Sequence, residues 1–142
     1  MSHQLITYPS WDEVAPDFAG DGGLRDIYIF GTTTADWERV LGALKTRHRG
    51  LRFTAGEVAA ELPDRAAEIF PMWDRGAAPL LSFEEGGVLV TCHFFTSEEI
   101  EFSIDPADIT GQQRLDAISG FLYELASVVG KVALLTPENL AS

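Results

Sequence analysis

Apolar and polar residues alternate along several short segments of this chain, and this alternation predicts β-strands. In Leu24–Phe30, for example, Ile27 and Ile29 alternate with Asp26 and Tyr28. Because successive side chains of a strand point to opposite faces, such a segment has one apolar face and one polar face. Similar patterns predict further strands over Leu51–Thr54, Pro79–Phe83, Val88–Phe95, Glu99–Asp105 and Val132–Leu135.

Two longer segments repeat apolar residues with the period of an α-helix. Thr33 is predicted to cap the first helix, with Asp36 as the acidic partner of a capping box. Thr110 and Gln113 form the same arrangement at the start of the second. The apolar stripes are Trp37, Val40, Leu41 and Leu44 in the first helix, and Leu115, Ile118, Leu122, Leu125 and Val129 in the second.

Proline positions predict shorter helical elements. Pro63 suits the first position of a helix, which is expected to run through Phe70 until Pro71 terminates or kinks it. A short helix is also expected within Pro9–Ala19. The remainder of residues 1–23 is rich in Gly and Pro, and we expect this N-terminal segment to be loosely ordered.

The predicted elements follow the order β-α-β-α-β-β-β-α-β in a chain of 142 residues, a length typical of one domain. Helices that are separated by a meander of hairpins favour a mostly antiparallel sheet with the helices packed on one side. The predicted fold class is therefore α+β, as a single domain over residues 1–142.

The hairpin formed by Val88–Phe95 and Glu99–Asp105 has two conceivable registers, which differ in loop length. A three-residue loop matches the apolar rows of the two strands, whereas a two-residue loop sets apolar residues beside carboxylates. The three-residue loop is favoured because a one-residue slip exchanges the two faces. His93 then lies directly opposite Glu101, and we expect an ion pair that raises the His93 pKa above its ordinary value of about 6.5.

Composition and charge exclude several classes of function. The formal net charge is −12, which repels phosphate backbones and anionic lipids, so neither nucleic acid nor a membrane is expected as a partner. The one cysteine, Cys92, cannot form a disulfide within the chain, and Met1–Ser10 lacks the pattern of a secretory signal. A cytoplasmic location is therefore expected.

The negative charge is concentrated in a segment that is predicted to be sheet. Between Gly76 and Gln113 no Lys or Arg occurs, but seven carboxylates do: Glu84, Glu85, Glu98, Glu99, Glu101, Asp105 and Asp108. These charges either keep an exposed sheet soluble or form a docking surface for a basic protein. The candidate contact residues are Glu98, Glu99, Glu101 and Asp105, together with Trp73, whose ring is expected to be half exposed.

Few patterns indicate catalysis, a metal or a cofactor. Cys92 and His93 are adjacent in a strand, so their side chains diverge and do not form a nucleophile–base pair. His93 with Glu99 and Glu101 could bind a metal, but no recognised ligand spacing accompanies them, and a cross-strand ion pair is the simpler interpretation. Gly20–Gly23 has neither the phosphate-loop nor the dinucleotide pattern, and no cofactor is expected.

Basic residues gather at the end of the first long helix. They are Lys45, Arg47, His48, Arg49 and Arg52. Cations at this position complement the helix dipole, and an anion-binding site is the alternative interpretation.

Several segments, taken together, resemble a known kind of protein. They are Asp26–Phe30 with Asp36 and Trp37, Cys92–Phe95, Glu99–Pro106 and Leu135–Asn139. In these segments the chain resembles small acidic bacterial proteins of uncharacterised function, of the general kind found as immunity partners of polymorphic toxins. The resemblance spans about Leu24 to Asn139. It implies a protein-binding role and assigns no functional residue.

We therefore expect a non-catalytic domain that binds a more basic protein through its acidic sheet face. If the partner is a toxin, inhibition would work by covering its basic active cleft. The alternative is a small enzyme or ligand-binding domain, with a pocket between the sheet and a helix near His93, Tyr28 and Asp26. No paired acid and base at a diagnostic spacing supports catalysis.

Overall fold

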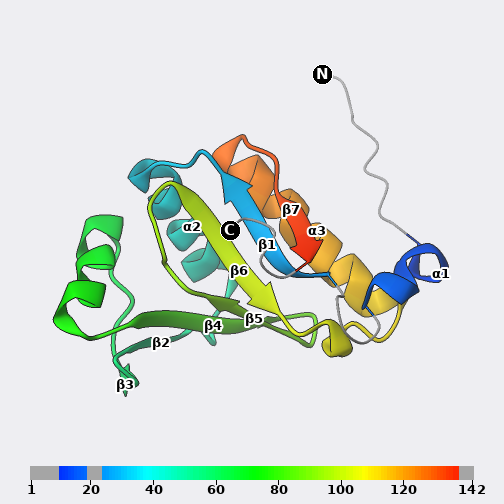
Figure 1. The fold of residues 1–142 in the computed structure, drawn as a ribbon, viewed down its shortest axis with the longest axis horizontal. Helices are drawn as coiled ribbons and strands as arrows, with labels where there is room; N and C mark the ends of the chain where they lie inside the picture. The colour runs from blue at the N-terminus through cyan, green and yellow to red at the C-terminus, as the bar shows by residue number, and fades with distance from the viewer. Residues whose placement is uncertain (1–9, 19–23, 138–142) are drawn as a thin grey trace.

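A seven-stranded antiparallel sheet organises the chain, in the order β3-β2-β4-β5-β6-β1-β7 (Figure 1). The computed structural model describes residues 10–18 and 24–137. The strands are β1 (Leu24–Phe30), β2 (Arg52–Ala55), β3 (Val58–Ala59), β4 (Pro79–Glu85), β5 (Val88–Cys92), β6 (Glu99–Ile104) and β7 (Leu134–Pro137). The helices are α1 (Trp11–Val14), α2 (Thr34–Arg47) and α3 (Gln112–Val129), with 3₁₀ turns η1 (Ala15–Phe18), η2 (Ala66–Glu68), η3 (Phe70–Arg75) and η4 (Pro106–Asp108).

The two long helices, α2 and α3, lie on the same face of the sheet (Figure 1), so the predicted α+β class is confirmed. The core fills the space between these helices and the sheet. There the rings of Phe83, Phe102 and Phe121 meet edge to face, with centroids 5.4 to 6.1 Å apart. The opposite face of the sheet is covered by neither α2 nor α3, and it carries the polar half of each alternating strand.

The predicted cap and apolar stripe of α2 are confirmed. The Asp36 N–H donates to Thr33 Oγ1 at 3.2 Å, and the Thr33 N–H donates to Asp36 Oδ2 at 3.1 Å. These reciprocal bonds satisfy backbone donors that a helix start leaves unpaired. The stripe of Trp37, Val40, Leu41 and Leu44 is fully buried.

The predicted start of α3 is wrong by about one residue, and the residue predicted to cap this helix does not do so. Gly111 occupies the N-cap position and makes no side-chain capping bond, so Thr110 lies outside the helix. In the buried stripe Phe121 takes the place expected for Leu122, which is only partly buried. Phe121 follows Ile118 by three residues, which is an equally good helical spacing, and its larger ring fills the core beside Phe83.

The helix predicted from Pro63 to Pro71 is also wrong. The segment forms two short 3₁₀ turns, η2 and η3, and Pro71 lies in the first turn of η3 instead of ending a helix. A proline fits there because its missing N–H has no partner to lose. Side chains of α2 hold this segment: Glu38 accepts from the Ala66 N–H at 3.0 Å, and Lys45 donates to the Leu62 carbonyl at 2.9 Å.

The β5–β6 hairpin follows the predicted register in its ladder but not at its turn. Thr91 pairs with Ser103 and Cys92 with Phe102, as a three-residue loop requires. The strand then ends, and an isolated bridge between Thr96 and Glu99 closes a tighter turn. The shift occurs at residues 93–95, where buried Phe94 has a φ of 34°.

The ends of the chain differ in part from expectation. Helical turns α1 and η1 form within the short helix predicted over Pro9–Ala19, while residues 1–9 and 19–23 of the expected loose segment lie outside the described residues. The last strand begins at Leu134 instead of Val132, and the short strand β3 was not predicted. Among the residues the structure describes, no helix combines the length and apolarity needed to cross a membrane.

Candidate functional site

The strand registers define which side chains share the sheet face that α2 and α3 leave uncovered, here called the uncovered face. One row of polar residues crosses six neighbouring strands on this face. Each residue of the row is the Cα partner of the next residue on the adjacent strand. The row runs through Arg52, Ser82, Thr91, Ser103, Asp26 and Thr136. A row of this length without an apolar member distinguishes this face from the apolar face under α2 and α3, although Asp26 and Thr136 within the row are buried.

Three of the four predicted acidic contact residues belong to the uncovered face. Glu99 and Glu101 project from β6, and Asp105 follows the strand, where its carboxylate accepts from the Ala107 N–H at 2.9 Å. These three residues are named the acidic strip. Glu98 lies in the hairpin turn, where its side chain is exposed and its carbonyl accepts from the Thr32 N–H at 3.0 Å.

The acidic strip is not neutralised by cations in the described part of the chain. Neither Glu99 nor Glu101 forms an ion pair there, whereas Asp36, Glu85 and Glu124 each do. Burial raises the pKa of Glu101, and the nearby carboxylates of Asp26 and Glu99 raise it further. Mutual repulsion of this kind is relieved either by a proton or by an incoming cation.

Tyr28 lies beside these carboxylates. It is the Cα partner of Glu101 across β1 and β6, and the interaction of its hydroxyl with that carboxylate raises the Tyr28 pKa and lowers the Glu101 pKa. Burial, followed by the charges of Glu101, Asp26 and Glu99, raises the Tyr28 pKa to about 12. The phenol therefore stays neutral at physiological pH.

Stacked rings lie on both sides of β6. On β1, Tyr28 and Phe30 stack with centroids 5.2 Å apart at 11°. Beyond the end of β5, Phe95 stacks on His93 at 5.3 Å and 2°, and on Trp73 at 5.8 Å and 26°. These two groups are named the aromatic flanks, because β6 lies between β1 and β5 in the sheet.

The aromatic flanks expose much of their apolar area. Phe30 is 43% exposed, Phe95 55% and Trp73 40%, which confirms that the Trp73 ring is half exposed. The Trp73 indole N–H donates to the Phe94 carbonyl at 2.9 Å, so the ring is held in place. Ordered aromatic rings exposed beside charged groups are typical of protein contact sites.

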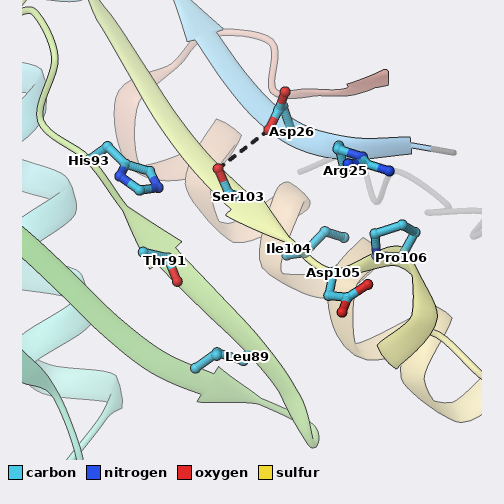
Figure 2. Close-up of a pocket in the computed structure, with 9 residues that line it drawn as sticks. All are labelled: Arg25, Asp26, Leu89, Thr91, His93, Ser103, Ile104, Asp105 and Pro106. Atoms are coloured by element: carbon cyan, nitrogen blue, oxygen red, sulfur yellow. Dashed lines mark hydrogen bonds between the residues drawn. The ribbon is translucent and has the colours of Figure 1, made fainter. Parts of the chain in front are cut away.

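A cavity of about 490 Å³ lies on the uncovered face, between β1, β5 and β6 (Figure 2). Its lining consists of Arg25, Asp26, Leu89, Thr91, His93, Ser103, Ile104, Asp105 and Pro106. The Ser103 hydroxyl donates to Asp26 Oδ1 at 3.4 Å. The pocket predicted between the sheet and a helix is thus corrected: His93 and Asp26 do line a cavity, but it lies on the other side of the sheet, and Tyr28 is not part of its lining.

His93 differs from the prediction in both partner and pKa. Because β5 ends at Cys92, His93 lies outside the ladder and is not paired with Glu101. Burial lowers the His93 pKa, while the charge of Asp26 acts in the opposite direction. The expected ion pair with a raised pKa is therefore wrong, and the neutral imidazole stacks on Phe95 instead.

Cys92 lies in the core, 1% exposed, with its pKa raised first by burial and then by the charge of Glu101. A thiol in this state is a poor nucleophile. Within the described ranges, no three His, Cys, Asp or Glu side chains converge closely enough to hold a metal ion.

Two residues of the basic cluster at the end of α2 contact the carboxylate of Glu85, which was not predicted to be their partner. Glu85 is 5% exposed, and it accepts from Arg47 at 3.0 Å and contacts His48 Nε2 at 2.8 Å. The alternation of β4 was the available signal, because it places Glu85 on the same buried face as Leu81 and Phe83. The cluster thus acts in part as the counter-charge of a buried acid.

Compared with known protein families, with curated proteins and with solved structures, the chain matches none. Its function is therefore inferred from the chemistry of the uncovered face.

Proposed function

We propose that this protein is a non-catalytic binding domain that docks a more basic protein on its uncovered face. One observation carries the proposal. The acidic strip, which has no cationic partner in the described part of the chain, lies between exposed aromatic rings on the face that α2 and α3 leave uncovered.

The two kinds of residue support binding in different ways. Carboxylates attract a basic partner over several ångströms and speed its association, in addition to the pull of the net charge of −12. Exposed aromatic rings bury a large apolar area on contact and slow dissociation. Solubility alone explains the charges but not the adjacent rings of Phe30, Phe95 and Trp73.

The resemblance to immunity proteins of polymorphic toxins supports a particular form of this function. Under that proposal the protein acts in the bacterial cytoplasm and inhibits a toxin by covering its basic active cleft. An acidic, well-ordered sheet face is suited to such a cleft, because opposite charges align the two surfaces before contact.

The experiment is partner capture followed by kinetic measurement. Glu99→Gln, Glu101→Gln and Asp105→Asn are combined in one variant, in which Asn retains the acceptor for the Ala107 N–H. We expect slower association, a weaker dependence on salt and an unchanged fold. The matched control combines three substitutions of exposed carboxylates outside the uncovered face, Glu57→Gln, Glu61→Gln and Glu68→Gln, with the same change in net charge.

Trp73→Ala tests the aromatic component separately, and we expect it to speed dissociation while association changes little. A captured partner whose affinity is the same for the wild type and the acidic-strip variant would overturn the proposal. The acidic strip would then serve solubility only.

A second candidate function has one specific observation in its favour. The cavity on the uncovered face combines the hydroxyls of Thr91 and Ser103 with the imidazole of His93 and the carboxylate of Asp26, which suits a small polar ligand. A small enzyme or ligand-binding domain would use this cavity. Ligand screening by thermal shift, with Thr91→Val as the cavity variant, distinguishes the two: a stabilising ligand that is lost in Thr91→Val favours the second function.

A further inference from the structure

The acidic strip has a regular spacing. Glu99 and Glu101 are two residues apart on β6, so their side chains leave the same face about 7 Å from each other. Each has an aromatic residue as its Cα partner on β1, with Phe30 opposite Glu99 and Tyr28 opposite Glu101. Phe30 is exposed whereas Tyr28 is buried, so Phe30 is the ring that an incoming side chain can reach beside this pair.

We infer that this part of the uncovered face is a receptor for arginine side chains of the basic partner. The inference rests on the proposed function and specifies the chemical group that the face recognises. A guanidinium is planar and presents N–H donors in a fork that fits a carboxylate, while its flat face stacks on an aromatic ring. The carboxylates of Glu99 and Glu101 and the ring of Phe30, which is 43% exposed, offer both kinds of contact, and buried Tyr28 supports the Phe30 ring by stacking on it.

Lysine uses this arrangement less well. Its ammonium is a compact, strongly hydrated charge that attracts a carboxylate but makes no flat contact with a ring. The face should therefore bind arginine more tightly than lysine at equal charge.

A bound arginine would also relieve the repulsion among the carboxylates of this face. Glu101 is repelled by Asp26 and Glu99, and a cation placed over the strip removes that repulsion. Two cations fit, since alternate residues of an extended segment are also about 7 Å apart. An Arg-Gly-Arg segment matches Glu99 and Glu101 in spacing.

The test uses the full-length protein and a capped pentapeptide, Gly-Arg-Gly-Arg-Gly, with two matched peptides that carry lysine or uncharged citrulline in place of arginine. Binding is followed by NMR chemical-shift titration. We expect shifts at Glu99, Glu101, Tyr28 and Phe30, an affinity for the arginine peptide about fivefold or more above that for the lysine peptide, and no binding of the citrulline peptide.

Two variants test which residues cause the preference for arginine over lysine. Phe30→Leu keeps an apolar side chain and all charges, and it should reduce the preference for arginine over lysine while leaving lysine binding unchanged. Glu99→Gln with Glu101→Gln should weaken both peptides, whereas the control with Glu57→Gln, Glu61→Gln and Glu68→Gln should bind both nearly as the wild type does.

Equal binding of the arginine and lysine peptides, or shifts confined to other surfaces, overturns the inference. Those results would leave the proposed function standing if the natural partner still loses affinity when the acidic strip is neutralised. Loss of the proposed function is recognised separately, by a partner whose affinity does not depend on the acidic strip.

Discussion

Tyr28 and Glu101 lie directly opposite each other on β1 and β6, and the phenol hydroxyl interacts with the carboxylate. This interaction lowers the Glu101 pKa, while burial, Asp26 and Glu99 together raise it more. Tyr28→Phe removes the hydroxyl that lowers the Glu101 pKa, so we expect this pKa to rise further. Glu99→Gln removes a repelling charge and should lower it. Carboxyl-carbon NMR titration measures both shifts, and a Glu101 pKa unaffected by Tyr28→Phe would show that the hydroxyl does not reach the carboxylate.

The raised pKa of Glu101 has a consequence for stability. Between its ordinary value of 4.5 and the raised value, the folded protein binds more protons than the unfolded chain, so stability falls as the pH rises through this window. Glu101→Gln removes the repulsion with the charges of Asp26 and Glu99. We expect it to stabilise the protein at neutral pH by up to about 0.5 kcal/mol after solvent screening. Denaturant unfolding at about pH 4 and about pH 7 should show the gain only at the higher pH.

The lowered pKa of His93 predicts a titration below 6.5 in the folded protein. The neutral imidazole stabilises the fold fully above 6.5, and this contribution is lost as the pH falls through the folded pKa. Asp26→Asn removes the charge that opposes the lowering, so the His93 pKa should fall further. Imidazole NMR titration, with His93→Gln to assign the signal, measures both. A His93 pKa above 6.5 would restore the ion pair that the hairpin register originally predicted.

Alternation and capping made most of the fold predictable, because both are local. Leu24–Phe30 coincides with β1, and Thr33 with Asp36 forms the predicted capping box. The helix predicted to begin at Pro63 was wrong because the conformation of that segment is set by its contacts with Glu38 and Lys45 of α2, and not by its own sequence. Tertiary contacts of this kind override local propensity and leave no periodic signal.

The candidate site was predictable in part for the same reason. Strand alternation correctly placed Glu99 and Glu101 on the face of the sheet opposite Ile100 and Phe102. It could not place His93, because the backbone departs from the ladder at Phe94, whose φ of 34° is rare for a residue with a side chain. The stacking of Phe95 on Trp73 joins the hairpin to η3, and a tertiary contact of this kind leaves no periodic signal in the sequence.

Asp36 connects both long helices, and its removal tests how they are held together. Its carboxylate, with a side chain 4% exposed, accepts from the Thr33 N–H, from Arg39 at 2.6 Å and from Lys131 at 3.1 Å. Asp36→Ala removes the reciprocal half of the α2 capping box and the link to Lys131 beyond α3, and we expect a loss of about 2 kcal/mol. Asp64→Ala is the control, since its pair with Lys45 is exposed and should matter little. Equal losses in the two variants would contradict a special role for Asp36.

Cys92 reports on opening of the core, because it is the one thiol of the chain and is 1% exposed. Its labelling by a thiol reagent should be slow in native protein and should accelerate with denaturant as the protein unfolds. Phe102 is its Cα partner on β6, and Phe102→Ala should destabilise the fold by about 3 kcal/mol or more and speed labelling about a hundredfold. Leu89→Ala removes a side chain that is 42% exposed and should change the rate little. Rapid labelling of the native wild type at neutral pH is the opposing result, since it would require an accessible thiolate and would favour an enzyme.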